Sequence, residues 1–302
     1  MLDVCLLGTG GTMPLKNRRL ASAIFRLNGK CVLIDCGEGT QVAVKEAGFT
    51  FKPIDVLCIT HFHADHISGL PGLLLSMGNE GRQEPLTIIG PRGLEHVVNC
   101  LRVIAPELPF QIRLLELSAP EMRFELSGFV ITAFRVRHST ECFAYRLDIE
   151  RVGKFDVQKA LANNVPKCVW SALQKSDRVI FEGVEYSADM VLGEKRRGIK
   201  VVYCTDSRPV PVIAKHAQNA DLLICEGMFG DDNKLERAEE TGHMLFSEAA
   251  ALAKAATARE LWLTHYSPSL DEPEAFLDAA KAVFENTELG TDGKYRLIRF
   301  ED

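Results

Sequence analysis

Three histidines and an aspartate lie within six residues of one another, in the segment Thr60-His61-Phe62-His63-Ala64-Asp65-His66. This segment directly follows the apolar run 56–60, which is typical of a buried strand. Chains that alternate strands and helices place their functional sites at the carboxyl ends of such strands. In an extended turn His61 and His63 point the same way, so they can share one ion while Asp65 and His66 serve a second. Because neutral imidazoles and carboxylates are zinc ligands, the segment predicts a metal site rather than a polar surface tract.

A dinuclear site needs further ligands, and three polar residues elsewhere in the chain come at the end of an apolar run. These residues are His138, Asp206 and His265. Strand ends meet at one edge of a sheet, so the three side chains can converge on the same site.

Three other histidines lack that context. His243 stands in a glycine loop before a predicted helix, a position that suits a mobile catalytic group better than a structural ligand. His96 lies in a helical run and His216 lies between a lysine and an alanine, so we interpret both as surface histidines.

Short strands alternate with helices along most of the chain, which predicts an α/β fold. Helices are clearest at 247–256 and 272–284, where Asp271 and Pro273 form a start signal. Strands are predicted at 2–7, 23–27, 31–35, 56–60, 86–89, 112–116, 129–135, 142–147, 200–204, 222–226, 260–264 and 296–300. Residues 150–198 are more polar and rich in lysine, so we interpret them as an inserted arm. A loosely packed, solvated segment is the alternative.

Composition and charge argue against several classes of protein, among them membrane-spanning proteins and general nucleic-acid coat proteins. With 25% charged and 46% hydrophobic residues, the 302-residue chain can build a sizeable core, either as two domains or as one large domain with two halves. No apolar run approaches the ~20 residues of a membrane span, and the amino terminus does not resemble a secretory signal. Nine cysteines without a Cys-x-x-Cys pair predict reduced thiols in a cytoplasmic protein. The net charge of −6 argues against a general nucleic-acid coat protein, although a local basic patch can bind phosphate.

The order of these candidate ligands resembles the metallo-β-lactamase superfamily. A His-x-His-x-Asp-His segment is followed by an isolated histidine, an isolated aspartate and a late histidine. The resemblance covers essentially the whole chain. It implies a single domain over 1–302, an αββα sandwich of two pseudo-equivalent halves with the metals at one edge of its sheets.

Further segments are similar to the ribonuclease Z family of that superfamily, whose members process the 3′ ends of tRNA. These segments are residues 8–18, which correspond to the family's opening strand and basic loop, and residues 153–156, at the start of the arm. The others are residues 35–41, 203–209, 241–243 and 263–267. Two features depart from the family. Residues 165–170 replace a Gly/Pro-rich stretch of the arm, and Arg19 stands where an asparagine commonly follows the basic loop.

The resemblance implies two zinc ions per subunit, with Asp206 bridging them. The two ligand sets would be His61, His63 and His138 for one ion, and Asp65, His66 and His265 for the other. Asp65 would also accept the proton of the nucleophile. His243 would stabilise the developing oxyanion or protonate the leaving 3′-oxygen. The implied reaction removes 3′ trailers from tRNA precursors by attack of a metal-activated hydroxide, and it leaves a tRNA 3′-OH.

The same resemblance implies the partners. Lys16, Arg18 and Arg19 are candidates for binding the acceptor end of the RNA, and the lysines of the arm for binding its elbow. In this family the arm of one subunit serves the active site of the other, which implies a homodimer. Another phosphodiesterase or small-molecule hydrolase of this fold is the alternative enzyme. A catalytically silent RNA- or metal-binding protein is disfavoured, because every expected ligand position is filled.

Overall fold

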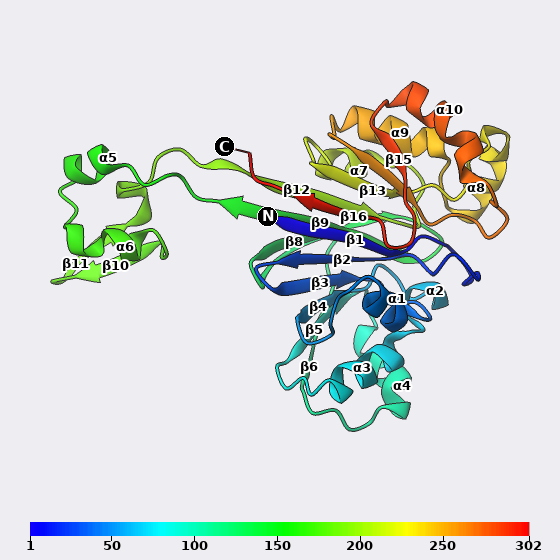
Figure 1. Ribbon diagram of the computed structural model, residues 1–302, viewed down its shortest axis with the longest axis horizontal. Coiled ribbons are helices and arrows are strands. Elements are labelled where there is room, and N and C mark those ends of the chain that lie inside the picture. Colours follow the sequence, from blue (N-terminus) through cyan, green and yellow to red (C-terminus); the bar gives the residue numbers. More distant parts are fainter. Residues whose placement is uncertain (302) are drawn as a thin grey trace. The chain divides into compact units, whose positions relative to one another are not determined.

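The computed structural model describes residues 1–301 (Figure 1). The chain divides into two compact units. The first comprises Met1–Asp148 and Ile199–Arg299, and the second comprises Ile149–Gly198 together with the residues from Phe300 on. None of the helices within residues 1–301 is both long and apolar enough to cross a bilayer.

The first sheet of unit 1 has seven strands in the order β16-β1-β2-β3-β4-β5-β6. Their bounds are β1 Leu2–Gly8, β2 Ser22–Leu27, β3 Lys30–Ile34, β4 Ile54–Cys58, β5 Leu86–Gly90, β6 Ile112–Glu116 and β16 Tyr295–Ile298. The strands from β3 to β6 pair in parallel, whereas β1 pairs antiparallel with both β2 and β16. Parallel strands are covered on both faces, which explains the continuous apolar run at the end of β4.

The second sheet also has seven strands, in the order β15-β14-β13-β12-β9-β8-β7. Their bounds are β7 Glu121–Leu126, β8 Phe129–Arg137, β9 Glu141–Arg151, β12 Arg196–Cys204, β13 Leu222–Glu226, β14 Leu261–Thr264 and β15 Thr287–Leu289. The strands from β12 to β15 pair in parallel, so their carboxyl ends share one edge. Strands β7 and β15 were not predicted. β7 alternates exposed and half-exposed residues at a sheet edge, and β15 has only three residues.

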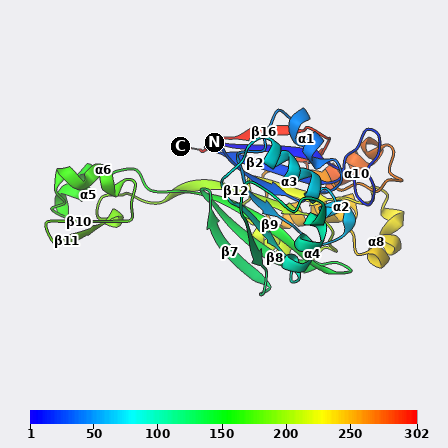
Figure 2. The same cartoon turned by 90° about the horizontal axis from the view of Figure 1, so that it is seen from below.

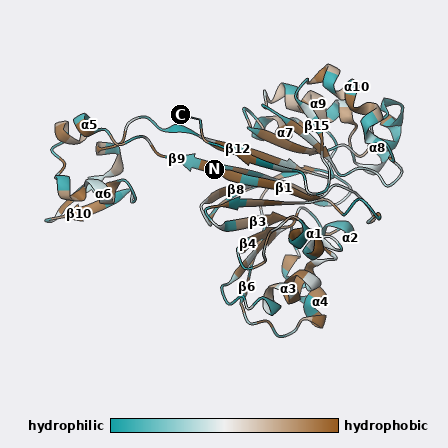
Figure 3. Ribbon diagram, in the orientation of Figure 1, coloured by the Kyte–Doolittle hydropathy of each residue, from teal (hydrophilic) through white to brown (hydrophobic). Residues whose placement is uncertain are grey.

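Helices cover the outer face of each sheet (Figure 1). On the first sheet lie α1 Thr40–Glu46, α2 Ala64–Ile67, α3 Leu70–Asn79 and α4 Leu94–Leu101. On the second lie α7 Pro211–His216, α9 Phe246–Ala255 and α10 Leu277–Val283, while α8 Leu235–Thr241 packs beside them on a small apolar cluster. The predicted helix 272–284 begins as a 3₁₀ turn, Pro273–Phe276, before α10. The layers confirm the predicted αββα sandwich. Figure 3 shows apolar residues concentrated in its strands.

Unit 2 has an apolar core of its own. It contains α5 Val157–Ala162, α6 Trp170–Leu173, and the hairpin of β10 Arg178–Phe181 and β11 Val184–Ser187, grouped together in Figures 1 and 2. The Trp170 indole donates to the Val165 carbonyl at 2.9 Å, and its ring lies 5.1 Å from that of Phe155. Six buried side chains form the core: Ala160, Val165, Val169, Leu173, Val191 and Leu192. The segment is therefore packed rather than loosely solvated.

The interpretation of His216 as a surface histidine is wrong. Its side chain is buried, with 2% of the residue exposed, because the last turn of α7 packs on β8. The imidazole stacks on Phe134 with ring centroids 4.0 Å apart, and its Nδ1 lies 3.3 Å from a guanidinium nitrogen of Arg146. His96 is exposed, as predicted.

Candidate metal centre

The seven predicted ligands lie where strands end at one edge of the two sheets. The Thr60–Asp65 segment leaves β4 and enters α2, which begins at Ala64, so Asp65 and His66 lie on its first turn. His138 follows β8, Asp206 follows β12, and His265 follows β14. Asp206 and His265 both have left-handed backbones, with φ of 51° and 58°. Residues other than glycine adopt this conformation uncommonly, and strained positions of this kind cluster at functional sites.

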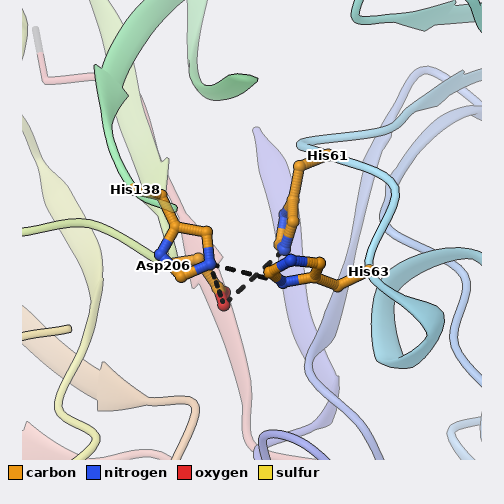
Figure 4. Close-up of side chains that lie close together, drawn as sticks. All are labelled: His61, His63, His138 and Asp206. Carbon is orange, nitrogen blue, oxygen red and sulfur yellow. Dashed lines mark hydrogen bonds and ion pairs between the residues drawn. The ribbon is translucent and has the colours of Figure 1, made fainter. Parts of the chain in front are cut away.

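One group of side chains gathers around one carboxylate oxygen of Asp206 (Figure 4). The Nε2 atoms of His61 and His138 each lie 3.7 Å from Oδ2 of Asp206. The Nδ1 atom of His63 lies 3.3 Å from Nε2 of His138. The ligand atoms of all four residues are within 4.8 Å of one another, a spacing that one ion can bridge.

A second group gathers around the other oxygen of Asp206. The Nε2 atoms of His66 and His265 each lie 3.1 Å from its Oδ1 and 3.2 Å from each other. Oδ2 of Asp65 lies 3.3 Å from Nε2 of His66 and 3.5 Å from Nε2 of His265. Asp206 thus stands between the two groups, with one oxygen directed at each.

The donor atoms fit a divalent metal. His61 Nε2 and Asp206 Oδ1 are buried and form no hydrogen bond with the described residues. A buried polar atom without a partner costs ~1–3 kcal/mol, a cost that an ion bound between these atoms would remove. Imidazole nitrogens and carboxylate oxygens are the ligand set of zinc and related ions.

Neighbouring groups orient the imidazoles. Nδ1 of His66 donates to Oδ2 of the fully buried Asp35 at 2.9 Å, and the other oxygen of Asp35 accepts from the Thr60 N–H at 2.8 Å. Nδ1 of His138 donates to the Gly242 carbonyl at 3.1 Å. In each case the Nδ1 atom carries the proton and Nε2 is free to face an ion, which is how metal-binding histidines are held in proteins.

Burial and charge set the protonation of the cluster. Burial lowers the pKa of His61 to about 2, so its imidazole is neutral, the form that binds metals. Burial alone would raise the pKa of Asp65, but the imidazoles of His265 and His66 outweigh it and lower that pKa. The same opposition lowers the pKa of the buried Asp206, through His265 and His66. Both carboxylates are therefore ionised.

Glu226, at the end of β13, is a site residue that the sequence analysis missed. It is fully buried, and its Oε2 accepts a hydrogen bond of 3.1 Å from Nδ1 of His243. Its carboxylate also accepts from the backbone N–H groups of Ser207 and Met244. Burial would lower the pKa of His243, but the charge and hydrogen bond of Glu226 raise it to about 9. Nδ1 of His243 lies 3.9 Å from Oδ2 of Asp206, and its ring centroid lies 5.0 Å from that of His138 and 5.5 Å from that of His265, so this pair borders both groups of ligands.

Comparison with known proteins places this arrangement in a family. The chain is 55% identical over 302 residues to a protein named ribonuclease Z from Agathobacter rectalis, with all of both chains covered. It is 53% identical to a ribonuclease Z from Lachnospira eligens, over 100% of this chain and 99% of the relative. The chain belongs to the ribonuclease Z family.

Two family models match parts of the chain, and a solved structure matches nearly all of it. A model described as "Anti-Pycsar protein Apyc1" matches residues 2–182, and one described as "Beta-lactamase superfamily domain" matches residues 182–266. Each of these covers part of the fold, whereas the ribonuclease Z relatives match from end to end. The crystal structure of the short form of human tRNase Z has a TM-score of 0.72 and 26% identity, covering 99% of this chain and 100% of that one. The predicted family, fold and class of enzyme, a nuclease of the hydrolases, are thereby confirmed.

The basic loop of the ribonuclease Z resemblance lies beside the second group of ligands. Gly11 packs against His265 so closely that a Cβ at residue 11 would lie 2.7 Å from the ring, which explains a glycine there. Arg18 lies over the Tyr266 ring, 5.3 Å from its centroid, and Arg19 pairs with Glu46 at 2.5 Å. Lys16 is exposed at the tip of the loop. Two of the three predicted RNA-binding cations therefore also make contacts within the protein.

Proposed function

We propose that this protein is a metal-dependent endoribonuclease that removes 3′ trailers from tRNA precursors. The products would be a tRNA with a free 3′-OH and a trailer with a 5′-phosphate. One observation carries the proposal. Two groups of metal-binding side chains share Asp206 next to the His243–Glu226 pair, in a chain more than half identical to proteins named ribonuclease Z.

In this proposal each subunit binds two Zn²⁺ ions, and the same donor atoms also suit other divalent ions. His61, His63 and His138 would hold one ion, Asp65, His66 and His265 the other, and Asp206 both. When bound, the two ions would supply Lewis acidity at a phosphate oxygen and lower the pKa of a water molecule. Two dications against the carboxylates of Asp65 and Asp206 leave the centre at about +2. A phosphodiester is therefore attracted to this site although the chain carries a net charge of −6.

Asp65 would accept the proton of the attacking water. Its Oδ2 accepts a hydrogen bond of 2.7 Å from the Thr12 N–H, which fixes the carboxylate between the two imidazoles of the second group. A base held in this way loses little orientational freedom in the reaction.

His243 would donate a proton to the leaving 3′-oxygen. Because Glu226 accepts the Nδ1 proton, the ring is fixed and its Nε2 is available to the substrate. Glu226 thus has the role toward His243 that the aspartate of a catalytic triad has toward its histidine. A positioned imidazole contributes ~10²–10⁴-fold to such a step.

The remaining parts of the proposal concern binding. Lys16, Arg18 and Arg19 would contact the acceptor end of the RNA from the rim of the site, and the arm over 150–198 would bind its elbow. The domain over 1–302 would act as a homodimer in the cytoplasm. Support for these points comes from the likeness to the ribonuclease Z family and from the position of the basic loop beside His265.

Cleavage of a defined precursor tests the function. Protein loaded with Zn²⁺ is incubated with a tRNA carrying a 3′ trailer, and the cleavage position is mapped. We expect one cut directly after the unpaired nucleotide that follows the acceptor stem, abolished by a chelator and restored by Zn²⁺. No cleavage, alongside bound metal and turnover of a small phosphodiester, would instead assign the protein to the general hydrolases of this fold.

A further inference from the structure

A cavity of about 590 Å³ opens beside the metal centre. Its wall includes Thr12, whose N–H contacts Asp65, and His243 itself. Its size falls within the ~300–1,000 Å³ of sites that bind small molecules or parts of larger ones. The cavity therefore borders both of the groups to which we assign proton transfer.

The cavity joins an apolar wall to a cationic one. Met228 and Phe229, which follow Glu226, are almost fully buried and supply the apolar surface. Lys234, just before α8, and Arg237, in its first turn, supply two positive charges, and none of the described residues that line the cavity carries a carboxylate. Lys234 lies over the Phe229 ring at 5.8 Å, and Arg237 forms a single exposed ion pair with Glu240. Exposed pairs of this kind are worth ~0–1 kcal/mol, so Arg237 can exchange Glu240 for a phosphate at little cost.

A neighbouring cavity marks where this binding surface ends. It measures about 400 Å³ and shares Lys234 and Ser269 with the first. Three carboxylates line it, those of Asp231, Asp271 and Glu272. A phosphodiester chain is repelled there, so the polarity of the two cavities confines an anionic ligand to the one beside His243.

We propose that the cavity beside His243 is a subsite for one nucleotide, the one whose 3′-oxygen leaves in the reaction. The proposal rests on the proposed function. His243 faces that oxygen and is also part of the cavity wall, so the ribose carrying the oxygen lies at the mouth of the cavity. Its base packs on Met228 and Phe229, and the phosphate on its 5′ side binds Lys234 and Arg237. Single-stranded RNA is generally bound through such a combination of unstacked bases and cations.

Placing an abasic nucleotide on either side of the cleaved bond tests which nucleotide the cavity takes. Two precursor tRNAs are compared, one with the abasic nucleotide just before the cleaved bond and one with it just after. For each, kcat/KM is measured with the zinc-loaded full-length protein. We expect the abasic site before the bond to lower kcat/KM about 5- to 150-fold, the range for losing one packed base. We expect the abasic site after the bond to change kcat/KM by less than about twofold. An equal or larger loss after the bond would overturn the assignment.

Charge removal tests the cationic wall. In Lys234→Met/Arg237→Met we expect the ratio of kcat/KM for the precursor to that for a small phosphodiester to fall about tenfold. The salt dependence of log kcat/KM should become shallower by about one unit. The matched control is Lys254→Met/Lys281→Met, which removes two exposed charges from α9 and α10 outside the cavity. If the Lys234→Met/Arg237→Met variant gives the same ratio and salt dependence as the control, the subsite proposal is overturned and the proposed function is not. A wild-type protein that leaves the precursor uncut overturns the proposed function as well.

Discussion

The guanidinium of Arg208 donates a hydrogen bond of 2.5 Å to the main-chain carbonyl of His243. The same group pairs with both oxygens of Glu248, at 2.8 and 2.5 Å. The backbone N–H of Arg208 donates to the Arg137 carbonyl at 2.8 Å. Since Arg208 follows Asp206 by two residues and Arg137 precedes His138, it ties together three loops of the metal centre.

Arg208→Lys should therefore disturb the position of His243 without unfolding the protein. A lysine cannot bind a carboxylate with two parallel hydrogen bonds while also reaching the carbonyl. We expect kcat to fall about tenfold or more and KM to change little, because misplaced catalytic groups cost rate rather than affinity. Steady-state kinetics on a tRNA precursor checks this. Arg102→Lys is the matched control, because Arg102 also donates to a carbonyl but lies on an exposed turn. Equal kinetics for both variants would leave Arg208 a purely structural residue.

Asp65→Ala should remove nearly all cleavage and leave the fold intact. Asp65 is both a proposed ligand and the proposed proton acceptor, and it lies in a short helix that packs on the apolar core of the first sheet through the buried Ile67. Precursor cleavage and thermal unfolding are measured on the same sample. Cleavage at the wild-type rate would remove Asp65 from the mechanism.

His243→Ala should lower turnover far more than RNA affinity. Loss of a general acid costs ~10²–10⁴-fold in rate. Glu226→Gln keeps the shape of the side chain but removes the charge that holds His243 protonated, so we expect a smaller loss in the same parameter. Single-turnover rates and equilibrium binding of the precursor separate the two effects. A defect confined to binding would contradict the role given to His243.

Deletion of residues 155–195 should impair cleavage of tRNA but spare a small phosphodiester. These residues carry the separate core of unit 2, and the chain can be rejoined because the remaining ends are close, with Nε of Arg196 donating to the Val152 carbonyl at 3.0 Å. Both activities are compared with the full-length protein. An equal loss of both would show that the segment supports the fold instead of binding RNA.

His216 predicts a dependence of stability on pH that lies away from the metal centre. Burial lowers the pKa of His216 below its usual 6.5, so the folded protein holds it neutral. The unfolded chain binds a proton as the pH falls below about 6.5, which favours unfolding. The contribution of the neutral His216 to the free energy of unfolding is thus complete above about pH 6.5 and is lost as the pH falls below it. In His216→Gln the free energy of unfolding should fall less steeply between pH 7 and 5 than in the wild type, as measured by urea titration. Parallel curves would show that His216 does not titrate in this way.

The sequence was informative where chemistry and burial conflicted. Histidines and aspartates directly after apolar strands have no packing reason to be there, and the fold does bring His138, Asp206 and His265 to the His61–His66 segment. Glu226 carried the same signal, a charge at the end of an apolar run. We assigned it to the strand, and its partner His243 lies 17 residues further on.

Other features depend on contacts that local patterns do not encode. The burial of His216 follows from the way α7 packs on β8, which the residues around it do not reveal. The role of Arg208 arises from three loops that meet only in the folded chain. The cavity beside His243 likewise joins the segment after β13, α8 and the turn after His265.

The chemistry of the product ends tests the central claim most directly. Zinc-loaded protein cleaves a tRNA precursor, and the new ends of both fragments are identified by enzymatic labelling and mass spectrometry. Hydrolysis at this metal centre predicts a 3′-OH on the tRNA and a 5′-phosphate on the trailer. A 3′-phosphate or a 2′,3′-cyclic phosphate on the tRNA would contradict it, because the 3′-oxygen would then not be the leaving group that His243 protonates.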